Sequence, residues 1–157
     1  MTADERFMRC ALTQARRSAA RDEVPVGAVV VKNGVILARA GNTRQNSHDP
    51  AGHAEINAMR RAAQRLGGWN LHDCELFVTL EPCPMCTGAA INARIARIVF
   101  GAADPKAGAC SSVLRLCKTP ELNHHPAVTG GVLEEPCAQI LKDYFKCKRR
   151  AHKNAGG

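Results

Sequence analysis

The chain has 157 residues, 45% of them hydrophobic, and this length suits a single domain with a sizeable core. No stretch approaches the roughly 18 consecutive apolar residues of a membrane span. The charged N-terminal residues lack the apolar segment of a secretory signal, so we expect a cytoplasmic protein without membrane attachment. The 22 lysines and arginines exceed the 14 aspartates and glutamates, which gives a formal net charge of +8. This charge favours a polyanionic partner, although many basic proteins bind no nucleic acid.

The hydrophobic pattern of the first hundred residues predicts helices that alternate with strands. We expect an amphipathic helix over residues 4–20, followed by a β-hairpin whose two apolar runs flank Asn33-Gly34. Asp49-Pro50 predicts the start of a second helix, which Gly67-Gly68 would end. Three shorter elements follow, namely a strand over residues 75–80, a helix over 84–93 and a strand over 97–101.

The last third of the chain is less regular until its final helix. Residues 102–123 are expected to form a long loop with one short helix, and residues 127–129 a short strand. The final helix carries one apolar face, which we expect to pack on the core and which consists of Cys137, Ile140, Leu141, Tyr144 and Phe145. Residues 151–157 are expected to fray. These elements favour a layered α/β domain spanning residues 1–157, and the hairpin makes its sheet mixed.

Two short motifs are candidates for chemistry, His53-Ala54-Glu55 and Pro82-Cys83-Pro84-Met85-Cys86. Each alone is weak evidence, because His-x-Glu is common on surfaces and Cys-x-x-Cys serves metal binding, redox chemistry or neither. Together they supply one imidazole and two thiols, and the predicted helix start at Cys83 stabilises thiolate. We therefore predict one Zn²⁺ per chain, bound by His53, Cys83 and Cys86.

Three protein ligands leave the fourth position of a tetrahedral zinc ion open for water, as in catalytic sites. Zinc lowers the pKa of such a water towards about 7. Glu55 lies two residues from His53, so we expect it to stand beside this water and move protons rather than bind the metal. The other six cysteines are expected to be small buried residues.

The order of His-x-Glu and Pro-Cys-x-x-Cys is the signature of zinc-dependent nucleobase deaminases. Nearly the whole chain also resembles the bacterial tRNA-specific adenosine deaminases. The resemblance is carried by Glu23-Val24-Pro25-Val26-Gly27-Ala28, by Asn42 before His48-Asp49-Pro50, by residues 78–86, by residues 97–102 with Asp104 and Lys106, and by residues 130–133 and 137–145.

The resemblance implies a three-layer α/β/α cytidine deaminase-like fold, in which a five-stranded mixed sheet carries helices on both faces. It implies a homodimer that converts adenosine to inosine at the first anticodon base, so the anticodon stem-loop of a tRNA is the expected partner. In the implied reaction an activated water attacks C6 of adenine, Glu55 takes the water proton and passes it to N1, and Glu55 then helps to protonate the leaving ammonia.

The resemblance also implies a set of substrate contacts. Asn42 would contact the target nucleotide, Val26 would line the pocket, and Ala54 and Pro84 would offer backbone groups near the base. Asp104 and Lys106 would touch flanking nucleotides. Phe145 and Arg149 would belong to an RNA-binding C-terminal helix. Two segments depart from the family pattern, Asn123-His124-His125 and residues 108–112, and neither touches the zinc motif.

The basic residues of the final helix have two possible interpretations. Lys142, Lys146 and Arg149 share one helical stripe, which would suit phosphate contacts or a merely solvated helix end. Without the resemblance, Asp104 and Lys106 would read as a solvated charged turn.

Three other functions are compatible with parts of the sequence. A deaminase of free guanine or cytosine would use the same zinc core, but it has no need of a basic helix. A structural zinc module that binds RNA would need a fourth protein ligand, for which Cys74 is the candidate. A redox Cys-x-x-Cys protein would leave His53 and Glu55 unexplained.

Overall fold

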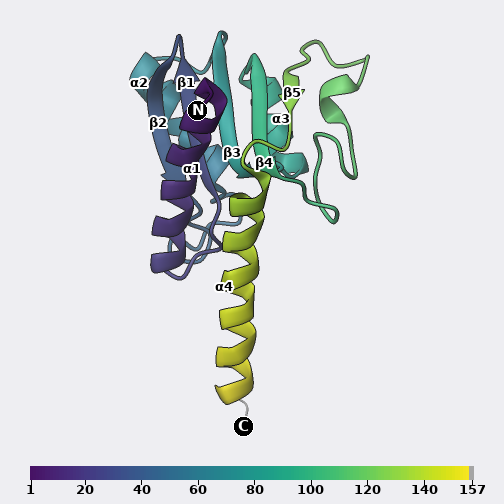
Figure 1. Cartoon of the computed structure of the whole chain (residues 1–157). Helices are drawn as coiled ribbons and strands as arrows, with labels where there is room; N and C mark the ends of the chain where they lie inside the picture. Colours follow the sequence, from purple (N-terminus) through teal and green to yellow (C-terminus); the bar gives the residue numbers. More distant parts are fainter. Residues whose placement is uncertain (156–157) are drawn as a thin grey trace.

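A mixed five-stranded sheet forms the centre of the computed structural model, which describes residues 1–155 (Figure 1). Its strand order is β2-β1-β3-β4-β5. The strands are β1 (Gly27–Lys32), β2 (Val35–Gly41), β3 (Cys74–Leu80), β4 (Arg97–Ala102) and β5 (Ala127–Thr129). Strand β1 pairs antiparallel with β2 and β3, whereas β3, β4 and β5 run parallel to one another.

Helices cover both faces of this sheet (Figure 1). They are α1 (Ala3–Ala20), α2 (Ala54–Leu66), α3 (Pro84–Asn92) and α4 (Glu134–Ala155), with a short 3₁₀ helix η1 (Leu116–Lys118). Helices α2 and α3 pack on one face, where Ala28 and Val30 point from β1, and α1 and the start of α4 pack on the other, with Val29 and Val31. Strand β1 is apolar on both faces because helices cover both. The predicted three-layer fold and its mixed sheet are confirmed.

Local sequence explains two of the connections. Asn33 and Gly34 both have positive φ, 50° and 76°, as the two-residue turn between antiparallel strands requires. Gly67 ends α2 in the left-handed conformation, with φ 77°, and its N–H donates to the carbonyl of Ala63. The predicted loop after β4 contains the expected short helix, η1.

The expected start of α2 at Asp49-Pro50 is wrong. Residues 43–52 form a closed loop instead, because the N–H of Thr43 donates to the carbonyl of Gly52 at 2.8 Å. The Asp49 carboxylate accepts the N–H of Ala51 at 2.9 Å, so this capping residue closes a turn rather than a helix. The helix begins at Ala54, with His53 as its N-cap.

The expected packing of the last helix is confirmed for its first half and wrong for Phe145. Cys137 is buried, and Ile140 and Leu141 are partly buried against the core, whereas Phe145 is 44% exposed. A helix of 22 residues is about 33 Å long, whereas the six-residue strand β4 spans about 20 Å, so the second half of α4 extends beyond the sheet (Figure 1). The expected frayed tail is helical as far as Ala155, and residues 156–157 lie outside the described residues. None of the helices in residues 1–155 has the length and apolarity to cross a lipid bilayer.

Candidate active site

Two helix starts bring the predicted zinc ligands together. His53 is the N-cap of α2, Cys83 is the N-cap of α3, and Cys86 lies in the first turn of α3. The His53 Nδ1 atom lies 3.6 Å from the Cys83 sulfur and 3.4 Å from the Cys86 sulfur. Pro84 fits the first position of α3 because proline needs no hydrogen-bonding N–H there. The three ligands therefore meet at one point although His53 and Cys83 lie 30 residues apart along the chain.

The spacing of these atoms fits a tetrahedral zinc ion. Zinc–sulfur bonds of about 2.3 Å and zinc–nitrogen bonds of about 2.0–2.1 Å place N and S roughly 3.6 Å apart. All three ligand atoms lie within 4.8 Å of one another. Cys74 does not belong to this group and lies at the start of β3, so the described residues provide an open site with three protein ligands.

The two thiols are electrostatically unequal. A hydrogen bond from Cys86 and a contact with His53 lower the pKa of the Cys83 thiol to about 4. The hydrogen bond with Cys83 and burial raise the pKa of the Cys86 thiol. The helix N-terminus adds a further preference for negative charge. Cys83 is therefore the ligand that is most readily available as thiolate, the form that binds metal.

Glu55 lies in the first turn of α2, beside the ligand group but outside it. Its side chain is 4% exposed and borders the same cavity as His53 and Cys83. Burial raises the pKa of Glu55 to about 7. A carboxyl group of this kind is able to accept and to return a proton near neutral pH.

A cavity of about 180 Å³ opens over the ligand group. Val26, Asn42 and Asp104, for which the family resemblance implies substrate contacts, line it. Asp104 also closes its own turn, since its Oδ1 accepts the N–H of Lys106 at 3.0 Å. Lys106 is exposed and is not part of the cavity wall.

The remaining predicted contacts lie around this cavity. Ala54 and Pro84 directly follow the ligands His53 and Cys83, and neither side chain lines the cavity; Ala54 is buried and Pro84 is exposed. Phe145 lines a second hollow of about 260 Å³. Arg149 is exposed on α4 and lines none of the cavities described here.

Two residues of the site were missed by sequence reasoning. Arg44 lines both hollows, which also share Val24 and Asn42, so the two form one continuous surface. Glu81 borders the first cavity and is 2% exposed. Burial raises its pKa, but hydrogen bonds from Ser112 and backbone amides outweigh this and hold the pKa of Glu81 below its ordinary value. Its place directly before Pro82-Cys83 is the one sequence signal that points to it.

Comparison with known families agrees with this geometry. The family model for the cytidine and deoxycytidylate deaminase zinc-binding region matches residues 1–102. The chain therefore belongs to this family of zinc-binding deaminases, as its motifs predict.

Individual relatives carry more specific names than the family model. The tRNA-specific adenosine deaminase of Bacillus subtilis is 43% identical over 155 residues, which cover 99% of this chain and 96% of the relative. The protein of the same name from Agrobacterium fabrum is 46% identical over 143 residues, which cover 91% and 94%. A solved structure from a study of A-to-I editing by tRNA:A34 deaminases at the wobble position has a TM-score of 0.84 and 46% identity. The superposed region covers 87% of this chain and 99% of the solved chain.

Proposed function

We propose that this chain deaminates adenosine to inosine at the first anticodon position of a tRNA. The observation that carries the proposal is the open group of His53, Cys83 and Cys86 with the buried carboxylate of Glu55 beside it. A closed structural site would have four protein ligands. The tRNA substrate and the wobble position come from the relatives and the solved structure described above, which resemble the chain along most of its length.

The reaction is a hydrolysis in which adenosine and water give inosine and ammonia. Zinc, when bound by His53, Cys83 and Cys86, supplies a water of lowered pKa as the nucleophile. Glu55 accepts one proton of that water as its oxygen bonds to C6, and delivers the proton to N1 of the adenine ring. It then takes the proton of the new C6 hydroxyl group and gives it to the amine, so that the C6–N bond breaks and ammonia leaves. These transfers place Glu55 where charge develops during the reaction, which favours the transition state over bound substrate.

Residues of the cavity wall orient the base for this attack. Val26 offers an apolar surface to the ring, and Asn42 offers an amide to the target nucleotide. Backbone groups of Ala54 and Pro84 would lie near the base, because each residue directly follows a zinc ligand. The base must leave its stack to reach the metal, which costs less in a loop than in a duplex.

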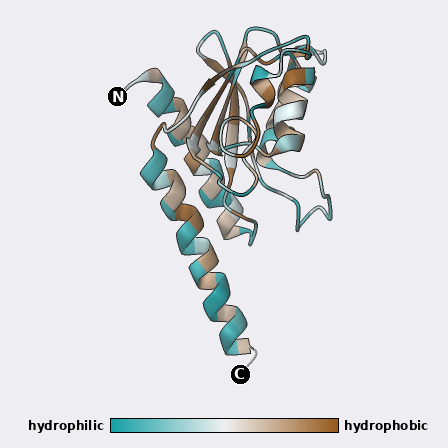
Figure 2. Cartoon of the chain, turned by 90° about the vertical axis from the view of Figure 1, so that its right-hand side faces the viewer, coloured by the Kyte–Doolittle hydropathy of each residue, from teal (hydrophilic) through white to brown (hydrophobic). Residues whose placement is uncertain are grey.

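The RNA flanking the target base would follow the second hollow towards α4. Phe145 and Arg44 both line this hollow, which therefore offers an aromatic ring for stacking and a cation. Asp104, which lines the cavity, and the exposed Lys106 of the same turn would contact flanking nucleotides. Because α4 protrudes from the domain and is largely hydrophilic (Figure 2), its basic stripe of Lys142, Lys146 and Arg149 is free to meet phosphates.

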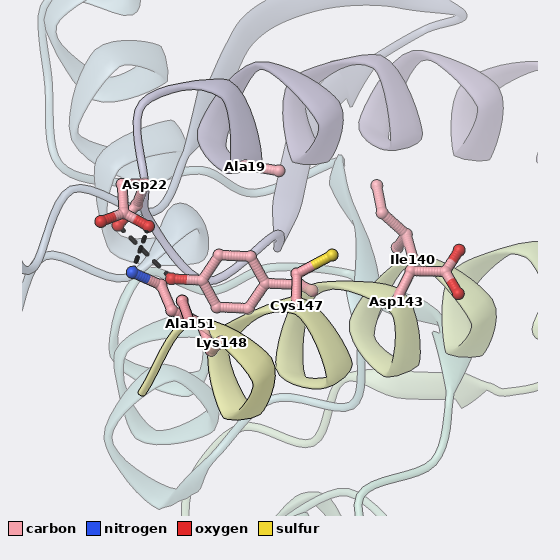
Figure 3. A pocket seen from close by; sticks show the side chains of 8 residues that line it. Ala19, Asp22, Ile140, Asp143, Cys147, Lys148 and Ala151 are labelled. Carbon is pink, nitrogen blue, oxygen red and sulfur yellow. Dashed lines mark hydrogen bonds and ion pairs between the residues drawn. The ribbon is translucent and has the colours of Figure 1, made fainter. Parts of the chain in front are cut away.

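The seating of α4 against α1 supports this arrangement (Figure 3). The Lys148 ammonium lies 2.5 Å from the Asp22 carboxylate, and the Tyr144 hydroxyl donates to the carbonyl of Asp22 at 3.4 Å. These contacts tie α4 to the loop that precedes β1. The helix thereby presents Phe145 to the hollow next to the candidate active site.

The proposal includes a cytoplasmic homodimer, each subunit of which is a single domain with one zinc ion. The dimer rests on the resemblance to the bacterial enzymes. Large apolar side chains are exposed on α3 and on the loop that contains η1, which contacts α3, namely Met85, Val113, Leu114 and Leu122. We assign these side chains to the dimer contact.

Incubation with a total tRNA pool, followed by sequencing for A-to-I changes, tests the proposed function. We expect conversion at the first anticodon position with the wild-type protein and none with Glu55→Ala. Free guanine and cytosine are tested in parallel. Conversion of a free base with no change in tRNA would replace the proposal with a free-base deaminase.

A further inference from the structure

The carboxylate of Glu81 is a hub of hydrogen bonds inside the protein. Its Oε1 accepts the N–H of Asp104 at 3.1 Å and the hydroxyl of Ser112. Its Oε2 accepts the N–H groups of Cys110, Ser111 and Ser112, at 3.1, 2.8 and 3.0 Å. Five donors from one loop, residues 104–112, therefore converge on a single side chain.

The balancing charge for Glu81 is spread over backbone dipoles. None of the ion pairs formed within residues 1–155 includes it. Successive backbone N–H groups that point at one anion form a concave nest, and hydrogen bonds to an ionised group are stronger than neutral ones. The 104–112 loop therefore takes its shape around this carboxylate.

Gly108 shows how closely the loop encloses Glu81. A Cβ atom on Gly108 would collide with the carboxylate carbon and both of its oxygens. Two backbone hydrogen bonds stabilise the same region. The N–H of Ala109 donates to the carbonyl of Pro82 at 2.9 Å, and the N–H of Glu81 donates to the carbonyl of Ala102 at 2.8 Å.

Glu81 thus joins two sides of the candidate active site. Along the chain it is two residues from the zinc ligand Cys83. Across space it holds the N–H of Asp104, whose side chain lines the cavity. Loss of this carboxylate would free the loop to shift relative to the metal ligands, since no other side chain within residues 1–155 accepts these amides.

We propose that Glu81 is a positioning residue for RNA, which holds the 104–112 loop and Asp104 in register with the zinc-binding turn. This inference rests on the proposed function, because it assigns the loop to the nucleotides that flank the target base. Glu81 lies outside the group of metal ligands, and both of its carboxylate oxygens bind the loop, so it acts through the loop. Its loss should therefore weaken RNA binding more than it slows the chemical step on bound RNA.

The test compares Glu81→Gln with wild type in zinc content, amide hydrogen exchange, and KM and kcat for an anticodon stem-loop RNA. Glutamine has the same size, but its NH₂ group faces donors that need an acceptor. We expect one zinc per chain, faster exchange of the amides of residues 110–112, a KM raised about tenfold or more, and a kcat within a few-fold of wild type. Glu75→Gln is the matched control, because Glu75 lies on β3 and pairs with Arg97 at 2.6 Å.

Two outcomes would overturn the inference. One is wild-type exchange and KM in Glu81→Gln, and the other is an equal change in KM in Glu75→Gln. If Glu81→Gln does not fold, Ser112→Ala removes a single donor, and it should still raise KM several-fold; an unchanged KM would count against the inference. A wild-type protein that leaves the stem-loop unmodified would refute the proposed function instead. Hydrogen exchange needs no substrate, so it would still test whether Glu81 holds the 104–112 loop.

Discussion

Gly27 of β1 passes so close to Ala11 of α1 that no Cβ fits between the strand and the carbonyl oxygen of the helix. The same Cβ would also meet the amide nitrogen of Ala15. This contact fixes α1 on the sheet next to Val26, which lines the candidate active site. We expect Gly27→Ala to lower the free energy of unfolding by about 1–3 kcal/mol, because neither backbone is able to yield without moving an element.

Denaturant unfolding measures this effect, with Gly88→Ala as its control. Gly88 lies inside α3, and a Cβ there meets nothing within 4 Å. Alanine favours helix over glycine, so the control should raise the free energy of unfolding by about 0.5–1 kcal/mol. Equal effects of the two substitutions would contradict the tight contact at Gly27.

Loss of one thiolate ligand should release the metal. We expect Cys83→Ala to lose most of its zinc, because two remaining ligands rarely hold the ion against water. Metal analysis of the purified protein gives the zinc content per chain. Cys147→Ala is the control, since Cys147 is exposed on α4 and should keep one zinc per chain. Full zinc retention in Cys83→Ala would refute the assigned ligand set.

Glu55 should separate catalysis from metal binding. We expect Glu55→Ala to retain zinc and fold while its turnover of tRNA falls at least about 10²–10⁴-fold, the usual contribution of a general acid–base group. Single-turnover deamination and zinc content are measured on the same sample. A variant with turnover within a few-fold of wild type would exclude the proton-transfer role of Glu55.

The basic stripe of α4 should appear in the salt dependence of tRNA binding. If Lys146 and Arg149 contact phosphates, the double variant Lys146→Ala with Arg149→Ala should bind more weakly. Its log–log salt slope should be flatter by roughly 1–2 units. Arg6→Ala with Arg9→Ala is the control, because it removes two exposed cations from the N-terminal half of α1. This half lies away from the protruding end of α4 (Figure 1). Parallel slopes and equal affinity for all three proteins would show that the stripe is only solvated.

Assembly is tested by sedimentation. We expect the wild-type protein to sediment as a dimer at micromolar concentration. Leu114→Asp, which places a charge at an exposed apolar position of the assigned dimer contact, should shift it to monomer. Val35→Asp adds the same charge at an exposed apolar position on β2 and should leave the dimer intact. A monomeric wild type would disprove the homodimer.

The features that the sequence predicted well are local. The turn at Asn33-Gly34 and the zinc ligands follow from neighbouring residues and motif spacing, so both could be placed before the fold was known. Glu81 could not, because its donors lie 23–31 residues further along the chain and meet it only after folding. The exposure of Phe145 was mispredicted for a related reason, since helical periodicity gives the direction of a face but not the depth of the sheet beneath it.

The zinc ligands lie at the starts of α2 and α3, the two helices that form one layer of the domain. Metal binding therefore cross-links that layer, and the folded chain takes part in a mass-action equilibrium with free zinc. Zinc at a hundred times its dissociation constant adds about 2.7 kcal/mol to the free energy of unfolding, a sizeable share of a domain's total. Zinc supply would then govern the fraction of chains that are folded as well as the fraction that are able to react.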